Sequence, residues 1–190
     1  MRESTADQIL ESAKQMVQTR GYNAFSYADI SERVGIRKAS IHYHFPTKAK
    51  LCQSLAQHYR QEVARELEQL TETVADPIEQ LQKFASIYRE CLSDDRLCLG
   101  GMLAADILTL PQEVQEEVGA YFGEIEAWVA KAIERGCEAG KLQSPASTLE
   151  IEARALISGL QGAQLAARAA GWDEDRFDAV ANRLIDGLRA

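Results

Sequence analysis

The chain of 190 residues has few of the features that mark membrane or secreted proteins. No stretch reaches the ~18 uninterrupted apolar residues of a membrane span. The best candidate, residues 155–172, is interrupted by Gln161, Gln164 and Arg168. The start has no apolar segment behind its charged residues, so we expect no secretory signal. The four cysteines are therefore expected to be reduced thiols, and the chain to work in the cytoplasm without a membrane partner.

Signatures of common enzymes are also missing. The chain contains neither G-x-x-x-x-G-K nor H-E-x-x-H. An enzyme remains an alternative only through His58 paired with a cysteine, the one nominal base and nucleophile. His42 and His44 offer a metal pair, but residues two apart on a helix point about 200° apart, and zinc prefers four ligands. We expect no catalytic residue, no metal and no cofactor.

Basic residues are fewer than acidic ones, and only the N-terminal part of the chain has a net positive charge. With 21 Lys and Arg against 29 Asp and Glu, the net charge of −8 argues against a uniformly basic nucleic-acid coat. Residues 1–50 hold eight basic and five acidic side chains, or +3, which leaves −11 for residues 51–190. The asymmetry predicts an N-terminal module that meets an anion and a body that repels it.

Apolar residues recur at helical spacing, and no segment shows the sustained alternation of a strand, so we predict an all-α fold. The apolar stripes lie within residues 9–17, 51–74, 78–91, 114–133 and 177–188, and the last helix is expected over residues 173–189. Gly21 is expected to end the first helix. Asp76-Pro77 and Ser144-Pro145 read as helix caps followed by a first-turn proline.

Residues 26–51 predict two short helices joined by a tight turn. Ser26 followed by Asp29 is typical of a capping box, and Gly35 ends the first helix. A second helix is expected over residues 38–44, which gives a helix-turn-helix whose second helix enters a DNA major groove. Thr47 caps the next helix, and Lys48 in its first turn opposes the helix dipole unless a phosphate docks there.

The two segments FSYADISERVGI (25–36) and IHYHFPTK (41–48), with Gly21 before and Leu51 after them, resemble the DNA-binding domain of the tetracycline-repressor (TetR) family. The resemblance implies a DNA-binding domain over residues 1–50 and a helical effector-binding and dimerisation domain over residues 51–190. It further implies a homodimer that binds a pseudo-palindromic double-stranded operator, and repression that a small molecule relieves.

The resemblance also assigns roles to residues. Those at base-reading positions are Lys38, Ala39, Ser40 and His42, and those at phosphate-gripping positions are Tyr27, Tyr43, His44 and Lys48. Arg37 departs from the family by replacing a Ser or Thr cap, so the recognition helix is expected to begin without a side-chain cap. The Arg37 guanidinium is instead expected to reach a phosphate or a guanine.

The C-terminal body yields a predicted dimer face. Small residues recur at spacings of four, three and four along residues 155–166, which lets another helix approach closely. With the last helix, this stripe predicts a four-helix seam between two subunits, formed by Ala155, Gly159, Gly162, Ala166, Leu184 and Leu188. The alternative is packing within one subunit.

A ligand cavity is expected between the helices of the body. Its predicted lining is Phe84, Tyr88, Cys91, Cys98, Met102, Phe122, Trp128 and Gln164. The run from Cys98 to Asp106 resembles a branch of the family in which a cysteine at a helix start senses oxidants or electrophiles, and a buried inert thiol is the alternative. A helical module that binds protein rather than DNA is the remaining rival, and it predicts no salt-dependent affinity for duplex DNA.

Overall fold

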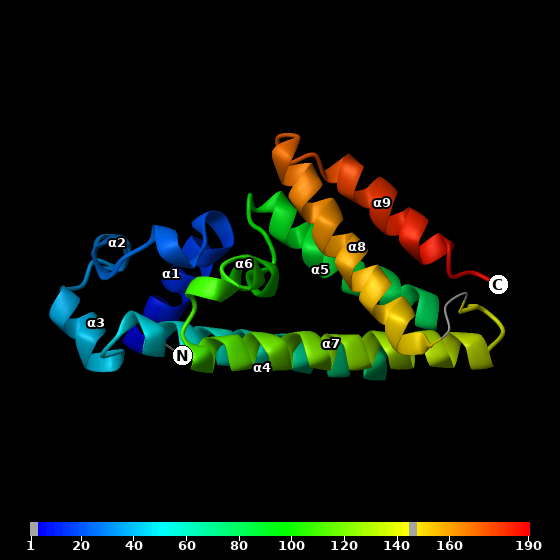
Figure 1. Ribbon diagram of the computed structural model, residues 1–190, viewed down its shortest axis with the longest axis horizontal. Coiled ribbons are helices and arrows are strands. Elements are labelled where there is room, and N and C mark those ends of the chain that lie inside the picture. The colour runs from blue at the N-terminus through cyan, green and yellow to red at the C-terminus, as the bar shows by residue number, and fades with distance from the viewer. Residues whose placement is uncertain (1–3, 145–147) are drawn as a thin grey trace. The chain divides into compact units, whose positions relative to one another are not determined.

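The computed structural model describes residues 4–144 and 148–190, and in these ranges it is helical, with no strand beyond an isolated bridge between Leu142 and Arg189. The all-α prediction is confirmed. The helices shown in Figure 1 are α1 (Thr5–Arg20), η1 (Tyr22–Ala24), α2 (Tyr27–Val34), α3 (Lys38–His44), α4 (Lys48–Thr73), α5 (Pro77–Ser93), α6 (Leu99–Ala105), η2 (Ile107–Thr109), α7 (Gln112–Glu138), α8 (Leu149–Ala169) and α9 (Glu174–Asp186).

Local sequence explains where these helices begin. Ser4 and Ser26 each form a capping box with the Asp three residues later, and the resulting hydrogen bonds lower the pKa of Asp7 and Asp29. Asp76 caps α5 with Pro77 in its first turn, as predicted. Pro145 lies outside the described residues, and α8 begins later than the Ser144-Pro145 pair suggested, with Thr148 as its cap.

Contacts group the described residues into two units. Unit 1 contains the described residues up to Glu62 together with Cys98–Tyr121. Its core is built around α1, whose apolar stripe is buried as predicted. Helices α2 and α3 each contribute one buried residue to this core, Ile30 and Ile41. Burial of one apolar residue from each short helix fixes the two helices on α1 and leaves their other faces available.

Unit 2 contains Val63–Leu97 and the described residues from Phe122 onward. Figure 1 shows α8 and α9 as an antiparallel pair, and α5 packs against both of them. The α8–α9 approach is close, because a Cβ on Gly159 would lie 2.5 Å from Cδ1 of Leu184. Gly159 and Leu184 therefore contact each other within one subunit, and both stay half-buried.

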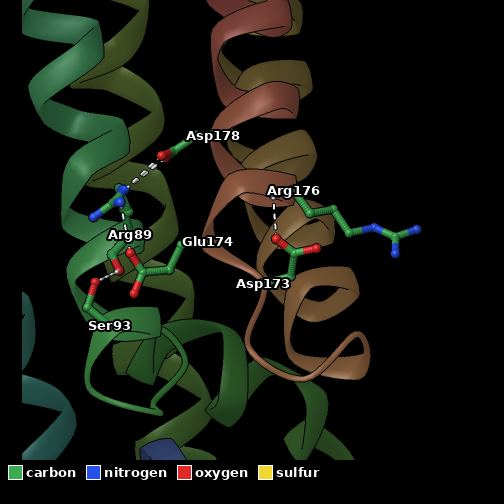
Figure 2. A network of polar contacts seen from close by, with 6 residues as sticks. All are labelled: Arg89, Ser93, Asp173, Glu174, Arg176 and Asp178. Carbon is green, nitrogen blue, oxygen red and sulfur yellow. Dashed lines mark hydrogen bonds and ion pairs between the residues drawn. The ribbon is translucent and has the colours of Figure 1, made fainter.

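Ion pairs join α5 to α9 at the solvent edge of unit 2. Figure 2 shows the Arg89 guanidinium between two carboxylates of α9, with Nη2 2.8 Å from Glu174 and Nε 2.9 Å from Asp178. The hydrogen bond that Arg89 donates to Asp178 is the main reason that the pKa of Arg89 is raised. Asp173 caps α9 by accepting from the Arg176 amide (Figure 2).

The last helix is shorter than predicted, and its buried face is shifted. Its buried residues are Phe177, Ala181 and Ile185, whereas Val180 is 39% exposed. Within the predicted stripe of residues 177–188, the large side chains lie at 177, 180, 184 and 188, whereas the structure buries the small Ala181 in place of Val180. A small side chain can be the buried one where two helices pack closely. Every helix in the described ranges is too short or too polar to cross a bilayer.

Candidate nucleic-acid interface

The helix-turn-helix forms from short-range bonds. Gly35 adopts the left-handed conformation (φ 74°) that ends α2, and its amide donates to the carbonyl of Ser31. The Ser31 hydroxyl then donates to the carbonyl of Ile36 at 2.6 Å, which fixes the turn. Helix α3 begins and ends at the predicted residues, Lys38 and His44.

One face of α3 is left to solvent. Ile41 is completely buried, and Phe45, which follows the helix, is nearly so. The predicted base-reading and phosphate-gripping residues of α3 lie on the other side, with Ser40 half-buried and the rest exposed: Lys38, Ala39, His42, Tyr43 and His44. Tyr43 is 84% exposed, which is unusual for so large a ring unless a partner covers it.

Arg37 precedes this helix and is exposed. It stands at the cap position, and its side chain makes no capping hydrogen bond, as expected for Arg in place of Ser or Thr. The Ser40 amide in the first turn of α3 instead donates to the carbonyl of Arg37 at 2.9 Å.

Tyr27 holds the two short helices together. Its hydroxyl donates to the carbonyl of Phe45 at 2.8 Å, and its ring lies 4.8 Å from the ring of His42. Burial raises the pKa of Tyr27 to about 12, so the hydroxyl keeps its proton. Because this single O–H is committed to Phe45, the residue shapes the interface rather than offering a free donor to it.

Lys48 is also partly committed within the chain. Its Nζ donates to the carbonyls of Tyr22 at 2.6 Å and Phe25 at 2.5 Å, and it lies 4.5 and 4.2 Å from the centres of those two rings. Burial lowers the pKa of Lys48. These carbonyls and rings offset the unfavourable interaction between the Lys48 ammonium and the positive end of the helix dipole. One of the three N–H donors of Lys48 is left for a phosphate.

These side chains border one hollow in unit 1. It has a volume of about 510 Å³ and is lined by Phe25, Ser26, Tyr27, Ala28, Lys38, His42 and Lys48. The start of α2 and two lysines therefore meet at a single depression beside the exposed face of α3. The ammonium groups of Lys38 and Lys48 at this open hollow suit an anionic oxygen of a polymer backbone.

Comparison with known proteins agrees with this geometry. Residues 9–55 match the model of the bacterial regulatory proteins of the tetR family. A TetR-family transcriptional regulator from Agrobacterium tumefaciens superposes with a TM-score of 0.92 at 38% identity, covering 97% of each chain.

The chain belongs to the TetR family.

A second TetR regulator, from Legionella pneumophila, has a TM-score of 0.88 at 31% identity over 99% of each chain. The HTH-type transcriptional repressor DhaR of Mycobacterium sp. (strain GP1) is 27% identical over 161 residues, which is 83% of this chain and 79% of DhaR. Members of the TetR family are transcriptional regulators and not enzymes, so the protein is a helix-turn-helix transcriptional regulator, and its curated relative points to repression.

The predicted ligand residues of this TetR-family regulator fall in both units. In unit 2, Phe84 lies 5.5 Å from Tyr88 and 5.7 Å from Trp128 between ring centres. Gln164 is 1% exposed and donates to the Tyr88 carbonyl at 2.9 Å, so its amide fixes α8 to α5. Trp128 donates to the carbonyl of Leu67 and to Thr71. Cys91 and Phe122 are half-buried in the same unit.

Met102 and Cys98 belong to unit 1. Cys98 stands at the cap position of α6 without a side-chain capping bond and is 3% exposed. Its Sγ lies 3.4 Å from the hydroxyl of Tyr121 and 3.6 Å from that of Tyr59. Its surroundings are those of a thiol enclosed by tyrosines. Cys52 is buried in α4, and burial raises its pKa to about 12, as for an inert core thiol.

The predicted dimer residues divide by burial. Ala155, Gly162 and Ala166 are exposed on one stripe of α8, beside Leu165, which is 56% exposed. Gly159 and Leu184 pack on each other, and Leu188 is buried. Gly159 and Leu184 are nevertheless only half-buried, so the dimer role of this set stays a prediction.

The sequence did not indicate that Asp106 of unit 1 binds the segment after α1. Its Oδ2 accepts from the Tyr22 amide at 2.7 Å, and its Oδ1 accepts from Nδ2 of Asn23 at 3.3 Å. No spacing rule links residues more than 80 positions apart. The available signal was Gly21, whose positive φ and missing side chain allow the carboxylate to approach the backbone there.

Proposed function

We propose that the protein binds a pseudo-palindromic operator as a homodimer and inserts one α3 of each subunit into the major groove. The observation that supports this proposal most directly is the exposed face of α3, which lies next to the hollow lined by Lys38 and Lys48. Bases are read by Arg37, Lys38, Ala39, Ser40 and His42, while Tyr43, His44 and the remaining donor of Lys48 contact phosphates. In a dimer, the two recognition helices lie about 34 Å apart, one turn of the duplex. Its place of work is the cytoplasm, where the operator DNA lies.

A small-molecule effector releases the DNA in this proposal. The aromatic group of Phe84, Tyr88 and Trp128 supplies apolar surface of the kind that binds such molecules between helices. Binding that favours a conformation with a different helix spacing lowers operator affinity by the difference in binding energy between the two states.

Modification of Cys98 is an alternative to a small-molecule effector as the event that releases the DNA. The thiol is 3% exposed between Tyr59 and Tyr121, so a reagent must first open this cluster. A Cys98→Ser variant that still leaves DNA on treatment with a thiol-reactive compound removes the alternative and keeps the regulator.

The operator proposal is tested by fluorescence anisotropy with duplexes from the protein's own upstream DNA. Lys38→Ala is expected to weaken binding at least fivefold, about 1 kcal/mol, and to change sequence preference, because a base contact is lost. Lys131→Ala removes the same charge from an exposed site on α7 and is the control. Equal affinity of Lys38→Ala and Lys131→Ala for every duplex would count against α3 as the reader.

A further inference from the structure

We propose that Asp106 is a positioning residue for operator binding, because its carboxylate clamps η1 and, through η1, the wall of the hollow that meets the DNA. The proposal rests on DNA binding by the α3 face and adds a residue that lies outside the helix-turn-helix. Asp106 follows α6 and is separated by 84 positions from the Tyr22 amide that it binds at 2.7 Å. All the groups involved belong to unit 1.

The clamp has two anchors on the carboxylate side. Oδ2 accepts from the Tyr22 amide, while Oδ1 accepts from Nδ2 of Asn23, which also donates to the hydroxyl of Thr109 at 2.9 Å. A charged acceptor makes stronger hydrogen bonds than a neutral one. The segment from Asp106 to Thr109 therefore holds two consecutive residues of η1.

The same η1 residues hold Lys48 on their other side. The Tyr22 peptide gives its N–H to Asp106, and its carbonyl accepts from Nζ of Lys48 at 2.6 Å. Carboxylate, peptide and ammonium thus form one chain in which each bond polarises the next. Phe25, whose carbonyl is the second acceptor for Lys48, lines the hollow with Ser26, the cap of α2.

Gly21 makes this approach possible. Its φ of +85° lies in the region that side chains disfavour, and a Cβ there would stand 2.8 Å from Oδ2 of Asp106. Any larger residue would push the carboxylate away from the Tyr22 amide. The glycine that ends α1 therefore also opens the space for the clamp.

Loss of the Asp106 carboxylate breaks one end of the series of hydrogen bonds that runs through the Tyr22 peptide to Lys48. The Tyr22 amide then has only water as a partner, and the carbonyls that hold Lys48 lose their fixed position. Since Phe25 and Ser26 lead directly into α2, the hollow and the start of α2 become less ordered before DNA arrives. DNA binding must then order them, which lowers affinity without removing any phosphate contact.

The test compares Asp106→Ala and Asp106→Asn in the full chain with Glu113→Gln, which removes the same charge from an exposed site in unit 1. The probe is a duplex enriched by the wild-type protein from a random-sequence library. The readouts are exchange of the Tyr22 amide by nuclear magnetic resonance, the dissociation constant for the duplex, and its dependence on salt.

Asp106→Ala is expected to speed exchange of the Tyr22 amide about tenfold or more, because local opening exposes it. It is also expected to weaken binding about three- to thirtyfold with an unchanged salt slope, since the slope counts phosphate contacts. Asp106→Asn keeps one acceptor oxygen and is expected to lie between Asp106→Ala and Glu113→Gln in both readouts. A merely structural defect would lower the melting temperature without this graded link to affinity.

Either of two results overturns the proposal: affinity in Asp106→Ala equal to that of Glu113→Gln, or unchanged exchange of the Tyr22 amide. If Asp106→Ala does not fold, Asp106→Asn decides, and an affinity equal to Glu113→Gln overturns the proposal. A folded wild-type protein that enriches no duplex at low salt contradicts the operator proposal instead, so the two failures are distinguishable.

Discussion

At the scale of single residues, Gly100 shows how little room unit 1 leaves around Cys98. A Cβ on Gly100 would collide with the ring of Tyr121, whose hydroxyl lies 3.4 Å from Sγ of Cys98. The tyrosine ring is buried, so it has no open direction in which to retreat. The absence of a side chain at position 100 is therefore a requirement of packing.

We expect Gly100→Ala to destabilise the protein by about 1–3 kcal/mol, the usual cost of overpacking. Gly119→Ala is the matched control, because Gly119 lies in α7 of the same unit with nothing within 4 Å of its Cβ position. The control should be stabilised by about 0.5–1 kcal/mol, since alanine favours a helix over glycine. Urea denaturation of both variants measures the difference, and equal stabilities would contradict the crowding at Gly100.

At the scale of elements, α2 is a helix of eight residues that depends on its start. The Ser26 amide donates to Oδ2 of Asp29 at 2.7 Å, and the Ser26 hydroxyl accepts from the Ala28 amide. So short a helix has little stability of its own and relies on its cap and on the burial of Ile30. The cap also belongs to the hollow, so the element and the interface share one residue.

Ser26→Ala is expected to cost about 1 kcal/mol of stability, the typical value of a lost helix cap. Ser4→Ala removes the same kind of capping box from α1 and should cost a similar amount. Only Ser26→Ala is expected to weaken operator binding, because only that cap lines the hollow. Thermal melting and anisotropy on the two variants measure these effects, and equal losses of affinity would show that the cap acts through stability alone.

At the scale of the whole molecule, α8 exposes a stripe of apolar side chains that a second subunit would bury. Ile151 is 47% exposed and Leu165 is 56% exposed, and small residues between them leave a shallow apolar face. An apolar face of this kind on a helix favours association with an identical face related by a two-fold axis. The operator proposal needs such a dimer to present two recognition helices.

Gly162→Glu is expected to convert the protein to a monomer, because a buried charge without a partner is costly in an interface. Gly123→Glu is the matched control, since both glycines are exposed and have nothing within 4 Å of their Cβ positions. Analytical ultracentrifugation measures the mass, and retention of the dimer by Gly162→Glu would place the interface elsewhere. The monomer should also bind the palindrome much more weakly than the control does.

The sequence by itself determined the helices of this protein and the place of its helix-turn-helix. Apolar spacing, the cap at Ser26 and the glycine at 35 act within one or two turns of chain, so they can be read in order along it. The same local reasoning gave the bounds of α3, which are Lys38 and His44.

Only the tertiary structure decided what the polar side chains of the interface do. The partners of Tyr27, Lys48 and Asp106 are backbone groups 18 to 84 positions away, so no local pattern announces them. The contact of Gly159 with Leu184 likewise joins positions 25 residues apart, and the small-residue spacing on α8 does not predict it. Hydrogen bonding and close packing depend on which segments meet in space, whereas helical periodicity depends only on the chain's own geometry.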